Sequence, residues 1–229
     1  MASSELQRLK VALLLFDGVD VLDFSGPLEV YNAFRHPRDG QDIARAVDHS
    51  FETTLLGIDR VVACESRLSV NVEMTFAEAL AGEIARFDIL VIPGAAPNTI
   101  QKLIKEHHPA LDFIAKFLHQ SRLAPPKART IQTVCTGALL LAAAGGLKNM
   151  RATTHTMGLD ALRRLEPSAT VLGMDEHDGR FVDGGADEYG NNIVTAGGVT
   201  CGIDASLYMG ELWAGKGAAK IAREILEIC

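Results

Sequence analysis

The chain has 229 residues, of which 48% are hydrophobic and 22% charged, and it carries a formal net charge of −7. The acidic balance argues against a nucleic-acid-binding surface, and no apolar stretch is long enough to span a bilayer. We therefore expect residues 1–229 to form one globular domain, and the absence of a signal-peptide pattern at the amino terminus favours a cytoplasmic location.

The first predicted strand, residues 9–16, is a continuous apolar run, as expected for a strand buried on both faces. A helix is predicted over residues 27–35. Between them, Asp23 is flanked by Leu22 and Phe24. In an apolar setting the pKa of a carboxyl rises, which suits it to donate or accept a proton. An aspartate at this point can equally cap the helix, and the sequence leaves both interpretations open.

The middle of the chain alternates between strands and helices after a polar stretch, residues 36–50, that we interpret as a surface insertion. Strands are predicted over residues 51–57, 60–64 and 87–94, and helices over residues 98–106 and 109–120. Gly94 and Ala95 then belong to a loop of small residues. Such a loop lets backbone N–H groups approach a ligand, although any tight turn between a strand and a helix has a similar composition.

Cys135 directly follows a predicted strand, residues 130–134, and a helix-forming run begins at Gly137. A sharp strand-to-helix turn of this kind exposes a nucleophile in many hydrolases. The amino terminus of the next helix lowers the pKa of a thiol, and its N–H groups can hold a developing negative charge. We favour a nucleophile at Cys135 over the alternative of a buried structural cysteine.

The last third contains shorter predicted elements: strands at residues 151–155, 169–173, 180–185 and 192–198, and helices at residues 157–165, 200–213 and 218–228. Gly197 and Gly198 allow close backbone approach, but the full G-x-G-x-x-G of a dinucleotide site is absent. Strands that alternate with helices predict an α/β fold with a mostly parallel sheet covered on both faces. The active site of such a sheet lies beyond the carboxyl ends of its strands.

The other cysteines, Cys64, Cys201 and Cys229, are widely spaced and form no C-x-x-C pair. They predict neither a disulfide framework nor a zinc site, and the histidines show no H-E-x-x-H spacing. We expect free thiols, no metal and no cofactor.

Four stretches together resemble the ThiJ/PfpI superfamily: "VALLLFDGVDVLDFSGPLEV", "DILVIPGA", "TVCTGALLLAAAGGLKNMRATTH" and "TAGGVTCGID". The resemblance implies a flavodoxin-like sandwich similar to the class I glutamine amidotransferases, with Cys135 as the nucleophile on a sharp turn. It also implies that Asp23 is the acid paired with that nucleophile, as in the isocyanide hydratases of the superfamily. Many other members are described with glutamate at the corresponding place.

The resemblance extends to the surroundings of the thiol. The backbone at Ala95 and Thr136 matches the oxyanion-binding positions, and Val199 matches an apolar residue beside the nucleophile. His155, in the R-A-T-T-H motif, could lie near the site, but we favour a structural role beneath it. Members with a Cys-His pair usually place histidine directly after the cysteine, where this chain has Thr136. A homodimer is implied, and the helix-turn-helix domain of the superfamily's regulators is not expected after Cys229.

Three functions follow from the resemblance. The first is a cofactor-free hydratase that converts isocyanides to N-substituted formamides through Cys135 and Asp23. The second is a glyoxalase or deglycase that acts on methylglyoxal-type substrates through the same thiol. The third is a non-enzymatic sensor of a metabolite or an oxidant, in which Cys135 becomes oxidised.

Overall fold

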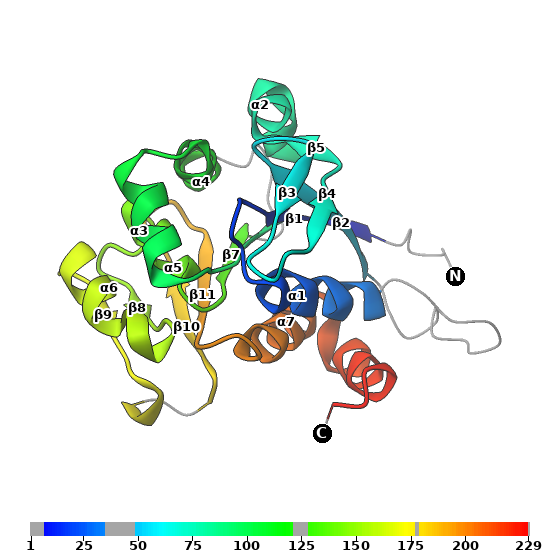
Figure 1. Ribbon diagram of the computed structural model, residues 1–229. Helices are drawn as coiled ribbons and strands as arrows, with labels where there is room; N and C mark the ends of the chain where they lie inside the picture. The colour runs from blue at the N-terminus through cyan, green and yellow to red at the C-terminus, as the bar shows by residue number, and fades with distance from the viewer. Residues whose placement is uncertain (1–6, 35–48, 121–127, 177–178, 229) are drawn as a thin grey trace.

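The computed structural model describes residues 7–34, 49–120, 128–176 and 179–228. At its centre is a seven-stranded sheet in the order β10-β11-β7-β6-β1-β2-β5 (Figure 1). Its strands are β1 (Gln7–Leu14), β2 (His49–Gly57), β5 (Met74–Thr75), β6 (Ile89–Ile92), β7 (Thr130–Thr133), β10 (Phe181–Ala186) and β11 (Asn192–Ala196). All neighbours pair in parallel except β10 and β11 at one edge. The predicted mostly parallel sheet is confirmed.

Helices cover both faces of this sheet, which explains why its central strands are buried on both sides. On one face α1 (Val21–Ala33) and α7 (Cys201–Ile225) lie side by side (Figure 1). On the other face α5 (Gly137–Ala143) packs against α3 (Pro97–Lys105) and α4 (Pro109–His119). Every residue of β6 and β7 is buried as a result. The core therefore lies directly beneath the carboxyl ends of these two strands.

A buried polar network ties α1 and α7 to the strand that leads to Cys135. The Tyr31 hydroxyl donates to Gln132 Oε1 at 2.8 Å, and Gln132 Nε2 donates to Ser206 Oγ at 2.8 Å and to the Gly202 carbonyl at 3.1 Å. Buried side chains of this polarity are stable only when they are paired in this way. Tyr31 belongs to α1, Gln132 to β7, and Gly202 and Ser206 to α7, so these hydrogen bonds fix the position of both helices relative to β7.

Helix α1 begins at Val21 rather than at the predicted position near Pro27, which lies inside the helix. The cap is Asp20, whose carboxylate accepts a hydrogen bond from the Leu22 N–H at 3.0 Å. Because Asp20 satisfies the helix terminus, Asp23 falls in the first turn and is fully buried. The interpretation of Asp23 as the cap is therefore wrong.

The region after α5 is less regular than predicted. The expected strand over residues 151–155 extends only over β8 (Arg151–Ala152), which pairs with β9 (Thr170–Val171) in a separate two-stranded sheet. A 3₁₀ turn (Thr156–Gly158) leads into α6 (Leu159–Leu165), and another covers Met174–Glu176. The two predicted carboxyl-terminal helices form one element, α7, which is broken at Gly215 by non-helical backbone angles (φ 86°, ψ 164°).

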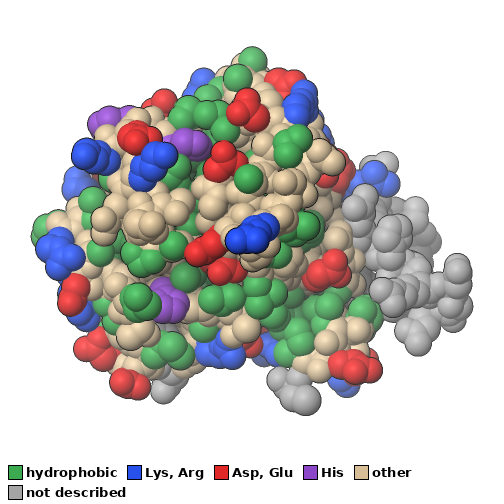
Figure 2. Space-filling view, in the orientation of Figure 1, with side chains coloured by type: hydrophobic (Ala, Val, Ile, Leu, Met, Phe, Trp, Pro, Cys, Tyr) green, Lys and Arg blue, Asp and Glu red, His purple; other side chains and the backbone are tan. Residues whose placement is uncertain are grey.

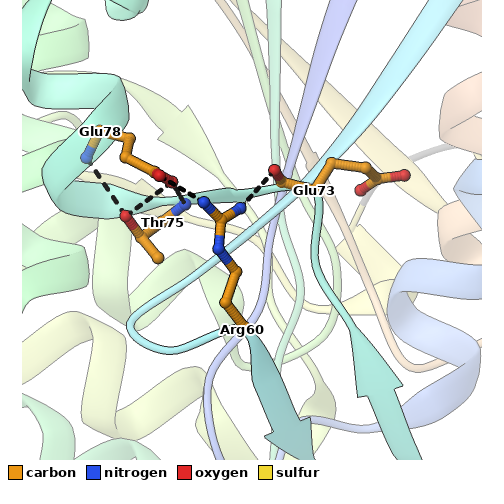
Figure 3. A network of polar contacts seen from close by, with 4 residues as sticks. All are labelled: Arg60, Glu73, Thr75 and Glu78. Atoms are coloured by element: carbon orange, nitrogen blue, oxygen red, sulfur yellow. Dashed lines mark hydrogen bonds and ion pairs between the residues drawn. The ribbon is translucent and has the colours of Figure 1, made fainter.

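The strand predicted over residues 60–64 is observed as β3 (Val61–Ala63), which forms a hairpin with β4 (Ser69–Asn71). The other short elements before β6 were not predicted: β4 itself, α2 (Phe76–Glu78), a π-helical turn (Ala79–Glu83) and a 3₁₀ turn (Ile84–Arg86). An exposed network holds them together (Figure 3). Thr75 and Glu78 form a reciprocal capping box, and Arg60 pairs with Glu78 while donating to the Glu73 carbonyl at 2.6 Å. Most of the polar stretch over residues 36–50 lies outside the described residues.

The described helices include none that is long and apolar enough to cross a membrane. On the face of the molecule seen in Figure 2, basic side chains alternate with acidic and hydrophobic ones. This face therefore lacks the basic stripe that typically contacts a nucleic-acid backbone.

Candidate active site

Residues that follow four neighbouring strands meet at one edge of the sheet. Asp23 lies beyond β1, Gly94 beyond β6, Cys135 beyond β7 and Val199 beyond β11. The Gly94 N–H donates to Asp23 Oδ2 at 2.9 Å, and the Cys135 N–H donates to the Gly197 carbonyl at 2.8 Å. Parallel strands carry their carboxyl ends to the same edge, so this convergence follows from the topology.

Cys135 lies on a sharp turn between β7 and α5. Its φ is +55°, a left-handed conformation that costs a residue with a side chain about 1–2 kcal/mol. The turn is closed by a hydrogen bond from the Gly137 N–H to the Val134 carbonyl at 2.9 Å. Cys135 is only 8% exposed, so the thiol is buried rather than on open surface.

The electrostatics of this thiol differ from the expectation. Burial raises the pKa of Cys135 to about 12, and the negative charge of Asp23 adds to the rise. Hydrogen bonds from the backbone N–H groups of Val199 and Thr136 lower the pKa, but by less. The sequence-based expectation of a lowered thiol pKa is therefore wrong for the resting protein, because a short helix terminus does not offset desolvation beside a carboxylate.

The pKa of Asp23 is well above that of an ordinary surface aspartate. Burial raises its pKa from 3.8 to about 7, with Asp20 adding to the rise. Its hydrogen bonds to the Gly94 N–H and to Cys135 act in the other direction. Oδ1 makes no further hydrogen bond of ordinary geometry within the described part of the chain. A carboxyl with a pKa near 7 beside a thiol can exchange a proton with it at neutral pH.

Two backbone N–H groups were expected to hold a negative charge, those of Ala95 and Thr136. The Ala95 N–H instead donates to Thr136 Oγ1 at 2.9 Å, and the same hydroxyl donates to the Ala95 carbonyl at 2.7 Å. The Ala95 N–H could therefore bind a ligand only after breaking its hydrogen bond to Thr136 Oγ1. The Thr136 N–H already points at the Cys135 sulfur, so it favours negative charge on that atom.

Val199 and His155 lie on the β11 side of the site. Val199 has a φ of 20°, an unusual value for a β-branched residue, and its N–H points at the Cys135 sulfur. The ring of His155 packs so closely on Gly198 that a Cβ there would stand 2.7 Å from His155 Cδ2. His155 is half-buried and caps the 3₁₀ turn by accepting from the Met157 N–H at 3.1 Å, which is a structural role.

Two further features bear on what the site could bind. No group of three or more histidine, cysteine or acidic side chains within the described ranges could hold a metal ion. An apolar groove of about 290 Å³ lies between α1 and α7, lined in part by Leu22, Gly26 and Ile203. None of the predicted site residues lines it, so this groove is separate from the site around Cys135.

The turn that carries Cys135 requires glycine at position 137. A Cβ on Gly137 would stand 2.2 Å from the Ile92 carbonyl oxygen and 2.9 Å from that of Pro93. Both atoms belong to the backbone at the end of β6 and cannot move aside without breaking the sheet. We expect Gly137→Ala to lower the free energy of unfolding by about 3 kcal/mol or more, measured by urea denaturation.

Gly217→Ala is the matched control, because nothing lies within 4 Å of its Cβ position in α7. This variant should gain about 0.5–1 kcal/mol from the higher helix propensity of alanine. Equal urea midpoints for Gly137→Ala and the unmodified protein would contradict the close approach at the turn.

An open α/β sheet with a cysteine on a strand-to-helix turn, and a buried carboxyl beside it, defines a protein with a candidate cysteine-centred site. The sequence matches the model of the DJ-1/PfpI family over residues 9–209, and the chain belongs to this family. It is 30% identical over 220 residues to a protein named isonitrile hydratase from Pseudomonas putida, covering 96% of this chain and 78% of that protein.

Solved structures show the same fold. A ThiJ/PfpI family protein from Pseudomonas syringae superposes with a TM-score of 0.73 at 23% identity, covering 97% of this chain and 76% of that one. DJ-1beta from Drosophila melanogaster superposes with a TM-score of 0.71 at 16% identity, covering 97% and 100% of the two chains. The predicted flavodoxin-like fold of the ThiJ/PfpI proteins is thereby confirmed.

Proposed function

We propose that this protein is a cysteine-dependent hydratase that converts isocyanides to N-substituted formamides. The observation that carries the proposal is the buried pair of Asp23 and Cys135, in which a carboxyl with a pKa of about 7 interacts with a thiol on a strained turn. The likeness to a relative named isonitrile hydratase supports the same reaction. Isocyanides need a nucleophile and a proton at one carbon, which is what this pair supplies.

In the first half of the proposed reaction, ionised Asp23 accepts the Cys135 proton while the sulfur forms a bond to the terminal isocyanide carbon. The lone pair of that carbon then takes the same proton back from Asp23, which gives a thioimidate on the enzyme. The N–H groups of Thr136 and Val199 stabilise the sulfur while it carries negative charge. The proton that leaves the thiol is the one added to the isocyanide carbon, so this half of the reaction needs no acid from solution.

In the second half, a water molecule adds to the thioimidate carbon while Asp23 accepts one of its protons. The substrate nitrogen gains a proton, the carbon–sulfur bond breaks, and the remaining proton returns to the sulfur. The products are an N-substituted formamide and free Cys135, and the net change is addition of one water. Neither a metal nor an organic cofactor enters these steps.

The test is to incubate the purified protein with an aryl isocyanide and to identify the product by mass spectrometry and NMR. We expect the N-aryl formamide to form catalytically, and the rate to rise as pH passes through about 7, because Asp23 must be ionised to accept the thiol proton. A parallel incubation with methylglyoxal, without glutathione, tests for lactate.

Lactate without formamide would reject the hydratase in favour of a glyoxalase-type activity. A fully reduced protein that turns over neither compound would leave a sensor as the better description.

We propose in addition that the protein acts as a homodimer on a small molecule in the cytoplasm, as its family resemblance implies.

A further inference from the structure

The backbone of Cys135 is held from both sides by segments distant in sequence. Its N–H donates to the Gly197 carbonyl at 2.8 Å, and its carbonyl accepts from the Thr154 hydroxyl at 2.7 Å. At the start of α5 the Gly137 N–H donates to the Val134 carbonyl and the Leu139 N–H donates to the Thr136 carbonyl. Neither of these backbone hydrogen bonds uses the Cys135 carbonyl. The hydroxyl of Thr154 therefore takes the place of a helical N–H donor.

Thr154 is well placed for this task. It is 1% exposed and lies in the segment after β8 that was predicted as a strand. Its neighbour Thr153 anchors that segment, because the Thr153 N–H donates to Thr195 Oγ1 at 2.8 Å. Thr195 lies in β11, which pairs directly with β7, the strand that ends before Cys135. The donor is thus fixed to the same sheet as the group it holds.

We propose that Thr154 is a positioning residue that keeps Cys135 in its left-handed conformation and so keeps the sulfur in the reacting geometry. This deepens the proposed role of Cys135 as the nucleophile. A residue with a side chain returns readily to a negative φ, and such a rotation would swing the sulfur away from the N–H groups of Thr136 and Val199. A hydrogen bond to the carbonyl opposes that rotation, because turning the peptide plane breaks it.

The test compares Thr154→Val, which keeps the shape and removes the hydroxyl, with Thr153→Val. Thr153 is equally buried, but its hydroxyl donates to the Leu172 carbonyl at 2.7 Å, away from the turn. We expect Thr154→Val to lower kcat for an aryl isocyanide by about 10- to 100-fold with little change in KM, and Thr153→Val to leave kcat within about threefold. Thr154→Ser should restore most of the lost rate.

A second readout does not depend on the substrate. Amide hydrogen exchange at Cys135, whose N–H is held by Gly197, should be about tenfold faster in Thr154→Val than in Thr153→Val when the two variants have similar thermal midpoints. If the unmodified protein hydrates no isocyanide, the proposed function fails while this comparison still decides the role of Thr154.

Equal losses of kcat in the two valine variants, or equal exchange rates at Cys135, would show that Thr154 contributes only to general stability and would overturn the proposal. If Thr154→Val does not fold, Thr154→Ala and Thr154→Ser provide the same comparison, because these two differ only by the hydroxyl.

Discussion

Replacing Cys135 with alanine is expected to lower the turnover of an aryl isocyanide by at least about 10³-fold, because the proposed mechanism then lacks its nucleophile. The substitution removes one sulfur from a side chain that is already 8% exposed, so the variant should keep the fold of the unmodified protein. Formamide production is measured by chromatography, and the fold is checked by circular dichroism.

Cys64→Ala is the matched control for this experiment. Cys64 is also a buried free thiol, at 6% exposure, but it lies in the hairpin region after β3 and outside the proposed mechanism. We expect its activity to stay within about threefold of the unmodified protein. Full activity in Cys135→Ala would show that Cys135 is not the nucleophile and would overturn the proposed mechanism.

Asp23→Asn should lower turnover by about 10²- to 10⁴-fold, the usual contribution of a positioned acid or base, and should at the same time make the protein more stable at pH 8. The second effect follows from the raised pKa of the buried carboxyl. Its pKa is about 7 in the folded chain and 3.8 ordinarily, so folding disfavours the charged form. Asparagine cannot ionise and still offers an oxygen to the Gly94 N–H.

The sign of the pH dependence follows from linkage. Below pH 3.8 Asp23 is protonated in both states and costs no stability, and as pH rises to about 7 the unfolded chain gains by losing the proton. The full penalty, as much as about 4 kcal/mol, is present above pH 7. The stability difference between Asp23→Asn and the unmodified protein should therefore grow between pH 4 and pH 8 in urea denaturation.

Asp20→Asn is the control for the loss of turnover, since asparagine caps a helix about as well as aspartate. We expect this variant to retain activity. A stability difference for Asp23→Asn that does not change with pH would show that Asp23 is already ionised without cost in the folded protein.

Strands β1 and β6 could be predicted from the sequence because each contains a run of apolar residues. The place of Cys135 followed from the short strand pattern that ends at Val134, although β7 itself is mostly polar. The start of α1 could not be predicted, because either Asp20 or Asp23 can cap a helix. Only the folded structure shows that Asp20 is the cap and that Asp23 is buried in the first turn. The strand predicted over residues 60–64 corresponds to β3, but β4 and β5 were missed because they are only two or three residues long and lie at the surface.

The sequence indicated which residues form the site better than it indicated their pKa values and hydrogen bonds. The sequence places Cys135 at a helix terminus, which predicts a lowered thiol pKa, but the depth of burial and the neighbouring charge of Asp23 exist only in the folded chain. The same holds for Thr154. Its hydrogen bond to Cys135 joins residues 19 positions apart that follow no periodic pattern.

The two anchors of the Cys135 backbone lie at Thr154 and Gly197, both of which come later in the chain than the cysteine. Cys135 is synthesised before either anchor, so its backbone cannot be held from both sides until the segments around Thr154 and Gly197 have been made and have folded against it. Contacts between distant residues also form late in folding, because closing a long loop costs entropy before any bond repays it. The reactive conformation of the thiol is therefore among the last features to appear, and an incomplete chain carries Cys135 in a relaxed backbone.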